Sequence, residues 1–302
     1  MGARFGGHLW EQRRGLLALA RLATGIKRGK QLPSVPGPIV EREVAAPSPG
    51  LQRDFVKFCG GDPGHYRAQI PPHLLSQWSL PVMLEVAESL PYPPLKVINT
   101  GVRVEFLAPL PQVERLGVRA QLRQVEEQER AVRVVIDVST LLPNGEAALR
   151  ASLSMRVRKP QPKTASPMKA REEAPRLVAP DARELARYRL RATAGLEYSR
   201  LTGDYNPIHW SMAYARSTGL PGAILQGFAS LGLMFEALTK GLLSGDARAI
   251  AGLDVQFLRP IALPAEMGVY WVNSSVSLAT APQAPIAAFA QVQLRDLLGE
   301  VS

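Results

Sequence analysis

The sequence predicts an α+β protein made of two copies of one unit, in which an antiparallel sheet wraps a long apolar helix. Two repeated motifs carry this prediction. They are Gly101-x-x-Val104-x-Phe106-Leu107-x-Pro109, which recurs as Gly252-x-x-Val255-x-Phe257-Leu258-x-Pro260, and Pro72-x4-Gln77, which recurs as Pro221-x4-Gln226. The two offsets, 151 and 149 residues, are nearly equal, and self-similarity at one period indicates duplicated structure.

The composition is typical of a soluble globular protein. The 302 residues suffice for two domains of ordinary size, and 46% of them are hydrophobic and 21% charged. The single cysteine, Cys59, excludes a disulfide framework and favours a reducing compartment, so we expect the cytoplasm. No apolar run reaches the roughly 18 to 20 residues that span a bilayer.

The charge favours an anionic partner. A formal net charge of +10 suits an anionic small molecule or an acidic carrier protein. The arginines are scattered, with no basic stripe interleaved with aromatics and no nucleic-acid recognition motif, so nucleic acid is not expected. The four histidines and one cysteine are spread along the chain, so no metal site is expected.

Residues 1–38 form a basic amphipathic N-terminal extension and a linker. Its apolar residues are Leu9, Trp10, Leu16, Leu17, Leu19, Leu22 and Ile26, and its basic residues are Arg13, Arg14, Arg21, Lys27, Arg28 and Lys30. The pattern fits a helix docked on its own domain, a mitochondrial transit peptide or a helix lying on a membrane surface. A proline-rich stretch at 33–38 then predicts the linker.

Residues 39–160 are predicted to be the first domain. We expect strands at 39–44, 97–107, 117–124, 130–142 and 146–158, and helices at 51–59 and 72–90. The turn Pro143-Asn144-Gly145 is a strong hairpin signal before the last of these strands. A Pro- and Lys-rich linker follows at 161–180.

Residues 181–302 are predicted to be the second domain and to repeat the order of the first. We expect strands at 185–192, 249–258, 266–276 and 285–297, and helices at 194–201 and 225–243. If Gly299-Glu300 corresponds to Gly145-Glu146, the final strand of this unit is missing from the chain. The alternative is that the alignment of the two halves slips in this region.

The stretch Asp204-Tyr-Asn206-Pro207-Ile-His209 sets a carboxylate and an imidazole five residues apart. Asn206 is a good N-cap and Pro207 suits the first helical position, so a helix is predicted to start here. Asp204 then lies in the preceding loop and His209 in the first turn, where both could point into one cleft. Downstream, the N–H of Gly227 at the start of an apolar helix is suited to stabilise negative charge.

Each of these residues also has an ordinary structural interpretation. Asp204 and Asn206 are common in turns and caps, His209 could be a core histidine, and Gly227 could be a packing glycine. Tyr198, six residues before Asp204, is better explained as a core residue than as a catalytic one. Their joint occurrence inside a duplicated unit favours a functional site.

These residues resemble the hydratase motif of the MaoC-like family, whose members are (R)-specific enoyl-thioester hydratases and 3-hydroxyacyl-thioester dehydratases. The resemblance implies a tandem double hot-dog fold with an N-terminal helical extension. It implies an acyl-CoA or acyl-carrier-protein thioester as substrate, no other cofactor, and a monomer or homodimer. Asp204 and His209 would perform acid–base chemistry on a shared water, with Gly227 as backbone donor to the thioester oxygen.

The resemblance also places three residues near the substrate or behind the catalytic pair, namely Asn206, Gln226 and Tyr198. Many family members carry His where this chain has Gln226, a departure that weakens a role for that side chain but not one for the Gly227 amide. Two other functions remain open: a hot-dog acyl-thioesterase, and a non-catalytic protein that binds acyl thioesters or acyl carriers.

The first unit lacks the full motif. Its corresponding loop is Asp62-Pro63-Gly64-His65, two residues shorter between acid and imidazole, and Trp78 stands where the second unit has Gly227. Trp does not permit the close backbone approach that Gly allows. We therefore expect the first unit to be catalytically silent and, by resemblance to other double hot-dog proteins, to make room for a longer acyl chain.

Overall fold

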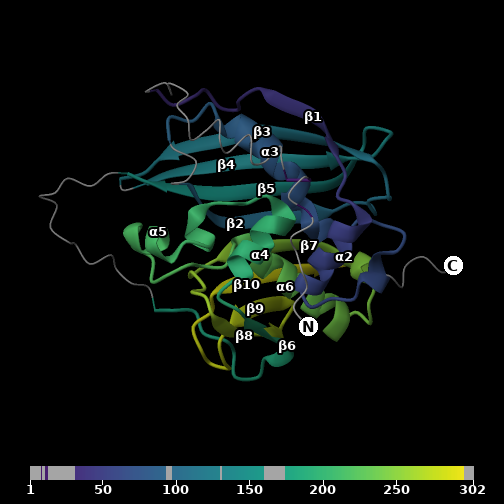
Figure 1. Ribbon diagram of the computed structural model, residues 1–302, viewed down its shortest axis with the longest axis vertical. Coiled ribbons are helices and arrows are strands. Elements are labelled where there is room, and N and C mark those ends of the chain that lie inside the picture. Colours follow the sequence, from purple (N-terminus) through teal and green to yellow (C-terminus); the bar gives the residue numbers. More distant parts are fainter. Residues whose placement is uncertain are drawn as a thin grey trace, which may run out of the picture.

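The fold is one continuous antiparallel sheet with the helices packed against it (Figure 1). A computed structural model describes residues 8, 11–12, 31–92, 97–129, 131–159 and 174–295. Ten strands pair in the order β1-β3-β4-β5-β2-β7-β10-β9-β8-β6. The first five in this order come from the first half of the chain and the last five from the second, as a duplicated unit requires.

The elements of the first half follow the predicted order. They are β1 (Ile39–Ala45), α2 (Pro49–Phe58), the 3-10 turns η2 (Pro63–Tyr66) and η3 (Pro72–Leu74), α3 (Leu75–Ala87), β2 (Val97–Phe106), β3 (Arg115–Glu127), β4 (Ala131–Leu141) and β5 (Ala147–Arg158). The predicted helix at 72–90 is therefore η3 and α3 in succession. The hairpin at Asn144-Gly145 is confirmed, with Gly145 at φ 85°.

The second half repeats this order of strands and longer helices, with α5 and η6 as further short elements. Its elements are β6 (Arg183–Leu190), α4 (Ala194–Thr202), η5 (Pro207–His209), α5 (Met212–Ser217), α6 (Gly227–Gly241), η6 (Ala247–Ala249), β7 (Ile250–Phe257), β8 (Ala265–Val272), β9 (Ser275–Ala279) and β10 (Ala288–Leu294). The short helix α5 has no equivalent in the prediction.

The predicted loss of a strand at the C-terminal end is wrong. The run 266–276, expected as one strand, is the hairpin β8–β9, whose turn residues Asn273 and Ser274 have φ of 45° and 57°. Two consecutive positive φ values are the requirement of a tight two-residue hairpin. The half therefore completes its five strands by Leu294, and the slip lies in the alignment of the two halves.

The two halves meet where β2 pairs with β7, and the repeated motif lies at this seam. Gly101 is opposite Gln256, and Glu105 is opposite Gly252. A Cβ on Gly101 would lie 2.6 Å from the Val255 carbonyl oxygen, and one on Gly252 would lie 3.0 Å from that of Val104. The close approach of β2 and β7 at both positions therefore explains why glycine recurs in the motif.

The core lies between the sheet and the two long helices. Helix α3 packs on β3, β1 and β4, whereas α6 packs on strands of the second half and also on β2 and η3 (Figure 1). The α6 side chains Leu231, Leu233 and Phe235 are fully buried, and burial of each such side chain contributes about 1.5–3 kcal/mol. This helix is apolar all round because protein surrounds it on every side.

Two predicted segments fall largely outside the described residues. These are the basic extension, of which residues 1–7, 9–10 and 13–30 are not described, and the linker between the halves at 160–173. Among the helices that the structure describes, none is long and apolar enough to cross a membrane.

Candidate active site

The loop that carries the predicted acid and imidazole is shaped by a helix end and a cap. Helix α4 ends at Gly203 in the left-handed conformation (φ 82°), which turns the chain towards Asp204. Asn206 then caps η5, since its side chain accepts from the Ile208 N–H at 3.3 Å. The predicted cap and Pro207 start are confirmed, but the helix is a single 3-10 turn that ends at His209.

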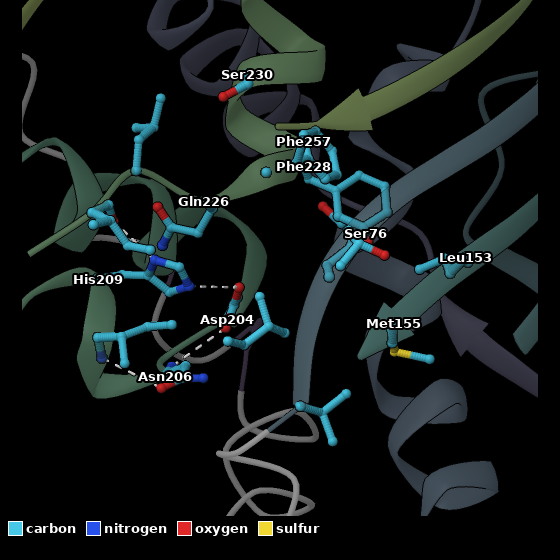
Figure 2. A pocket seen from close by; sticks show the side chains of 18 of the residues that line it. Ser76, Leu153, Met155, Asp204, Asn206, His209, Gln226, Phe228, Ser230 and Phe257 are labelled. Atoms are coloured by element: carbon cyan, nitrogen blue, oxygen red, sulfur yellow. Dashed lines mark hydrogen bonds and ion pairs between the residues drawn. The ribbon is translucent and has the colours of Figure 1, made fainter. Parts of the chain in front are cut away.

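Asp204 and His209 face each other across a short gap (Figure 2). The distance from Asp204 Oδ2 to His209 Nε2 is 3.7 Å, too long for a direct hydrogen bond but suited to a water bound by both. His209 Nδ1 lies 2.9 Å from the Ile224 carbonyl oxygen. A carbonyl only accepts, so Nδ1 carries a proton and Nε2 is the nitrogen directed at Asp204.

The surroundings hold this pair in place while leaving it accessible. The Asp204 side chain is 35% exposed and that of His209 is 9% exposed. Asp204 Oδ1 accepts from the Asn206 N–H at 3.3 Å, which fixes the carboxylate plane. One oxygen of the acid is thus used by the loop, and the other faces the imidazole.

Gly227 is the first residue of α6, where backbone N–H groups have no partner within the helix. A Cβ at this position would lie 2.7 Å from the ring of Phe257. Glycine is therefore required for β7 and the start of α6 to pack this closely. The result is a helix N-terminus, with its partial positive charge, at the wall of the same cavity as the acid–imidazole pair.

Gln226 joins the start of α6 to α4. Its side chain is 1% exposed, and Nε2 donates to the Gly195 carbonyl at 2.9 Å and to Ser199 Oγ at 3.1 Å. Ser199 Oγ in turn lies 2.6 Å from the Asp204 carbonyl oxygen. A chain of contacts thus runs from the residue before Gly227 to the backbone of the acid.

Sequence reasoning missed Ser199 and Gly195. A Cβ on Gly195 would lie 1.9 Å from the His209 carbonyl oxygen, so only glycine lets α4 pack against the η5 turn. The two residues are four positions apart and therefore share a helix face. That spacing is the sequence signal that could have indicated these two residues, although it does not reveal what this face of α4 contacts.

Tyr198 lies in the cavity wall and is 1% exposed. Its hydroxyl is 3.2 Å from Ser76 Oγ, and its ring packs against Phe55 and Phe58. Burial raises the pKa of Tyr198 well above its usual value, so the phenol stays neutral. The residue connects α4 to α3, consistent with the expectation of a core role.

The cavity extends from this pair into the first half of the molecule (Figure 2). Its volume is about 410 Å³, within the usual range for ligand sites. The distal walls are apolar and come from α3, β4 and β5, namely Leu80, Met83, Leu84, Ala87, Ile136, Leu153 and Met155. Exposed Leu258 and Arg259 also line it, which places an opening just beyond the end of β7.

The corresponding loop of the first half is arranged differently. Asp62 caps η2, since its Oδ1 accepts from the Gly64 N–H at 2.8 Å. Trp78 is buried in the first turn of α3, and its ring N–H donates to Thr140 Oγ1 at 2.9 Å. The helix starts at Leu75, so the Trp78 amide is not at the helix N-terminus. These arrangements support the prediction that this half is silent.

The second half of the chain is similar to known sequences. Residues 170–282 match the family model described as a MaoC like domain. The chain is 37% identical over 62 residues to the peroxisomal enoyl-CoA hydratase 2 of Arabidopsis thaliana, and 39% identical over 67 residues to the enoyl-CoA hydratase ChsH3 of Mycobacterium tuberculosis. These segments cover 20% and 22% of this chain, and 20% and 23% of the two relatives.

Comparison with solved structures identifies the fold of the whole chain. HtdX from Mycobacterium tuberculosis superposes with a TM-score of 0.69 at 19% identity, over 85% of this chain and 100% of that one. A MaoC-like dehydratase from Phytophthora capsici gives a TM-score of 0.65 at 17% identity, over 87% and 97%. A Mycobacterium tuberculosis protein described as a double hot-dog fold gives 0.55 at 12%, over 86% and 96%. The chain thus has a double hot-dog fold, and residues 170–282 in its second half match the MaoC like domain.

Proposed function

We propose that this protein catalyses the reversible hydration of trans-2-enoyl thioesters to (3R)-hydroxyacyl thioesters. The observation that carries the proposal is the pair Asp204–His209, held 3.7 Å apart on one wall of a cavity whose distal walls are apolar. The names of the two sequence relatives, both enoyl-CoA hydratases, support the reaction class.

The pair supplies what hydration of a conjugated thioester needs. A water bound between Asp204 and His209 gives its hydroxyl to the β-carbon, and the pair accepts the proton that this water loses. The pair also delivers one proton to the α-carbon, so it returns to its starting protonation state when the cycle closes. Both additions come from one wall of the cavity, which implies syn addition and accounts for a single stereoisomer.

The thioester oxygen gains negative charge during the reaction and needs a fixed donor. The Gly227 N–H at the start of α6 is that donor, and the helix dipole adds to its effect. Removal of one such donor in other enzymes costs about 100- to 1,000-fold in kcat. Gln226 and Ser199 hold the donor and the acid in register through the contacts described above.

The acyl chain lies in the apolar part of the cavity. Its distal walls come from the first half, so the silent half serves as the acyl-binding half. A substrate of about four carbons leaves most of the 410 Å³ unfilled, and burial of each further CH₂ contributes about 0.8 kcal/mol. Turnover is therefore expected to rise with chain length until the cavity is filled. Equal turnover on crotonyl and much longer chains would contradict this assignment.

One assay tests the function against its alternatives. Crotonyl-CoA and longer trans-2-enoyl-CoA thioesters are incubated with the protein, and the enoyl absorbance and free thiol are followed together. Loss of the enoyl signal without thiol release is the expected result. Thiol release would identify a thioesterase, and binding without turnover a non-catalytic acyl-thioester protein. Repetition with acyl-carrier-protein thioesters identifies the natural carrier.

The chain supplies matched controls for the catalytic pair. Asp204→Asn and His209→Ala should each lower kcat by about 100-fold or more, since general acid–base catalysis contributes that much. Asp62→Asn and His65→Ala make the same changes in the first half and should leave kcat within about twofold. A similar loss from both pairs would contradict the division into an active and a silent half.

A further inference from the structure

A glutamine from the N-terminal extension reaches the loop that carries Asp204. Gln12 is 3% exposed, and its Nε2 donates to the Leu201 carbonyl oxygen at 2.8 Å. Its Oε1 lies against Gly203, where a Cβ would be 2.9 Å from that oxygen. Leu201 and Gly203 form the last turn of α4, directly before Asp204.

The last turn of a helix has carbonyl groups with no partner inside the helix. In α4 the Leu201 carbonyl is such a group, and it is satisfied from outside by residue 12. The adjacent Gly203 turns the chain out of the helix with φ 82°. Gln12 therefore contacts the turn that directs the chain towards Asp204.

A second set of contacts fixes the position of Gln12. His8 Nδ1 lies 3.1 Å from Glu11 Oε1, and His8 Nε2 lies 3.0 Å from Asp54 Oδ2 on α2. Glu11 also accepts from the Ser48 N–H at 3.0 Å and from Ser48 Oγ at 2.8 Å, at the N-cap of α2. The residues next to Gln12 are thus tied to α2 by polar contacts.

We infer that Gln12 is a positioning residue for Asp204, held in place by the cluster of His8, Glu11 and Asp54. The inference rests on the proposed function, since it assigns to Asp204 a geometry that hydration requires. It gives this part of the N-terminal extension a role within the folded protein.

The cluster makes the contact depend on pH. A neutral imidazole has one N–H, so both carboxylates are bonded only when His8 is protonated. Burial would lower the pKa of His8, but the hydrogen bonds to Asp54 and Glu11 outweigh it and raise the pKa above 6.5. A positive charge also lies near the cluster, because His8 Cε1 and Arg53 Nη2 of α2 lie 3.6 Å and 3.9 Å from the position of a Cβ on Gly50. Because the pKa of His8 is raised in the folded protein, the stabilisation of the folded protein by protonated His8 is complete below pH 6.5. It is lost as the pH rises through the pKa that His8 has in the folded protein.

Hydrogen exchange and kinetics of the full chain test the inference. Gln12→Ala removes the donor, and Gln12→Glu keeps the shape while replacing the amide nitrogen by oxygen; Gln128→Ala, at an exposed turn, is the control. Both Gln12 variants should speed exchange of the amides of residues 202–206 by about fivefold or more. They should lower kcat by about five- to tenfold with KM little changed.

His8→Ala provides the pH signature that a purely structural residue would not give. At about pH 6 it should reproduce part of the Gln12 effect, and the ratio of wild-type to variant kcat should approach one at about pH 9. A ratio that does not change with pH would remove His8 from the inference.

The outcomes separate this inference from the proposed function. Wild-type exchange at residues 202–206 in both Gln12 variants would overturn the inference, and so would faster exchange with unchanged kcat. If the wild-type chain hydrates no enoyl thioester, the proposed function fails. The exchange of residues 202–206 then still decides whether Gln12 orders the loop.

Discussion

Helices α3 and α6 hold equivalent places in the two halves, but they border the cavity differently. Helix α3 lines it along its length, through Met83, Leu84 and Ala87 among others, whereas α6 lines it only in its first turn, and every residue of α6 from 229 to 239 is buried. Beyond that turn, side chains of the first half lie against α6. His73 stacks on Phe235 with ring centroids 4.3 Å apart, and its Nε2 lies 3.0 Å from Glu236 Oε1.

The difference fits the proposed division of the two halves into an active half and an acyl-binding half. Where the second half offers an acid, an imidazole and a helix N-terminus, the first half offers space. The region beside α6 is filled by rings and by the pair His73–Glu236, whose side chains are 0% exposed. Burial and the Glu236 carboxylate both raise the pKa of Tyr66 and of Cys59, so these groups remain neutral there.

The largest expected effect comes from the buried pair His73–Glu236 beside α6. Glu236→Ala leaves His73 in an apolar site without its partner, which should lower the free energy of unfolding by about 3–5 kcal/mol. Denaturant unfolding followed by circular dichroism measures this change. The double variant His73→Leu with Glu236→Met should recover most of the loss, since it leaves no buried polar group without a partner. A single variant within about 1 kcal/mol of wild type would contradict this account.

The next effect concerns the contact between α4 and the η5 turn. Gly195→Ala places a methyl group where the His209 carbonyl oxygen lies 1.9 Å away, so the backbone that carries the imidazole must move. Overpacking of this kind costs about 1–3 kcal/mol, and a displacement of His209 should lower kcat by about tenfold or more. Gly222→Ala is the control, because a Cβ there meets nothing within 4 Å.

A smaller and more selective effect is expected where α3 lines the cavity. Ala87→Phe places a ring in the cavity at the end distant from Asp204 and His209. Turnover of long enoyl thioesters should fall by about tenfold, while that of crotonyl thioester stays within about twofold. The ratio of kcat/KM for the two chain lengths reports the change. An equal loss on both substrates would indicate general disruption of the fold and not a shorter cavity.

The smallest effect tests the link between the acid and the helix donor. Ser199→Ala removes the hydroxyl beside the Asp204 carbonyl, and Gln226→Met removes the amide that reaches Ser199. Each loss of a hydrogen bond costs about 1 kcal/mol, so kcat should fall about fivefold. The double variant should fall less than the product of the two. Full additivity would show that the two side chains act separately.

The sequence was informative where structure depends on neighbouring residues. The duplicated order of strands and helices, the cap at Asn206 and the start of α6 near Gly227 all follow from local patterns. The β8–β9 hairpin was missed because its turn is Asn273-Ser274, without the glycine that usually marks positive φ. That omission produced the apparent loss of a strand.

The contacts that support the site were beyond sequence reasoning because they join distant segments. Gln12 meets Leu201 across 189 positions, and Gln226 meets Ser199 across 27. The pairing of His73 with Glu236 was not predicted, since nothing in the local sequence of either residue indicates a buried partner. The pattern locates the proposed reacting groups, whereas tertiary packing determines which side chains hold them.

The β2–β7 seam has a consequence for how the chain unfolds. Five residue pairs continue the hydrogen-bond ladder from one half into the other, so no free sheet edge separates them. A separated second half would expose β7 as an unpaired edge and would lose α3, β4 and β5 from its cavity. We therefore expect a single cooperative denaturation transition in the described core, with catalysis abolished by any cut that parts β2 from β7.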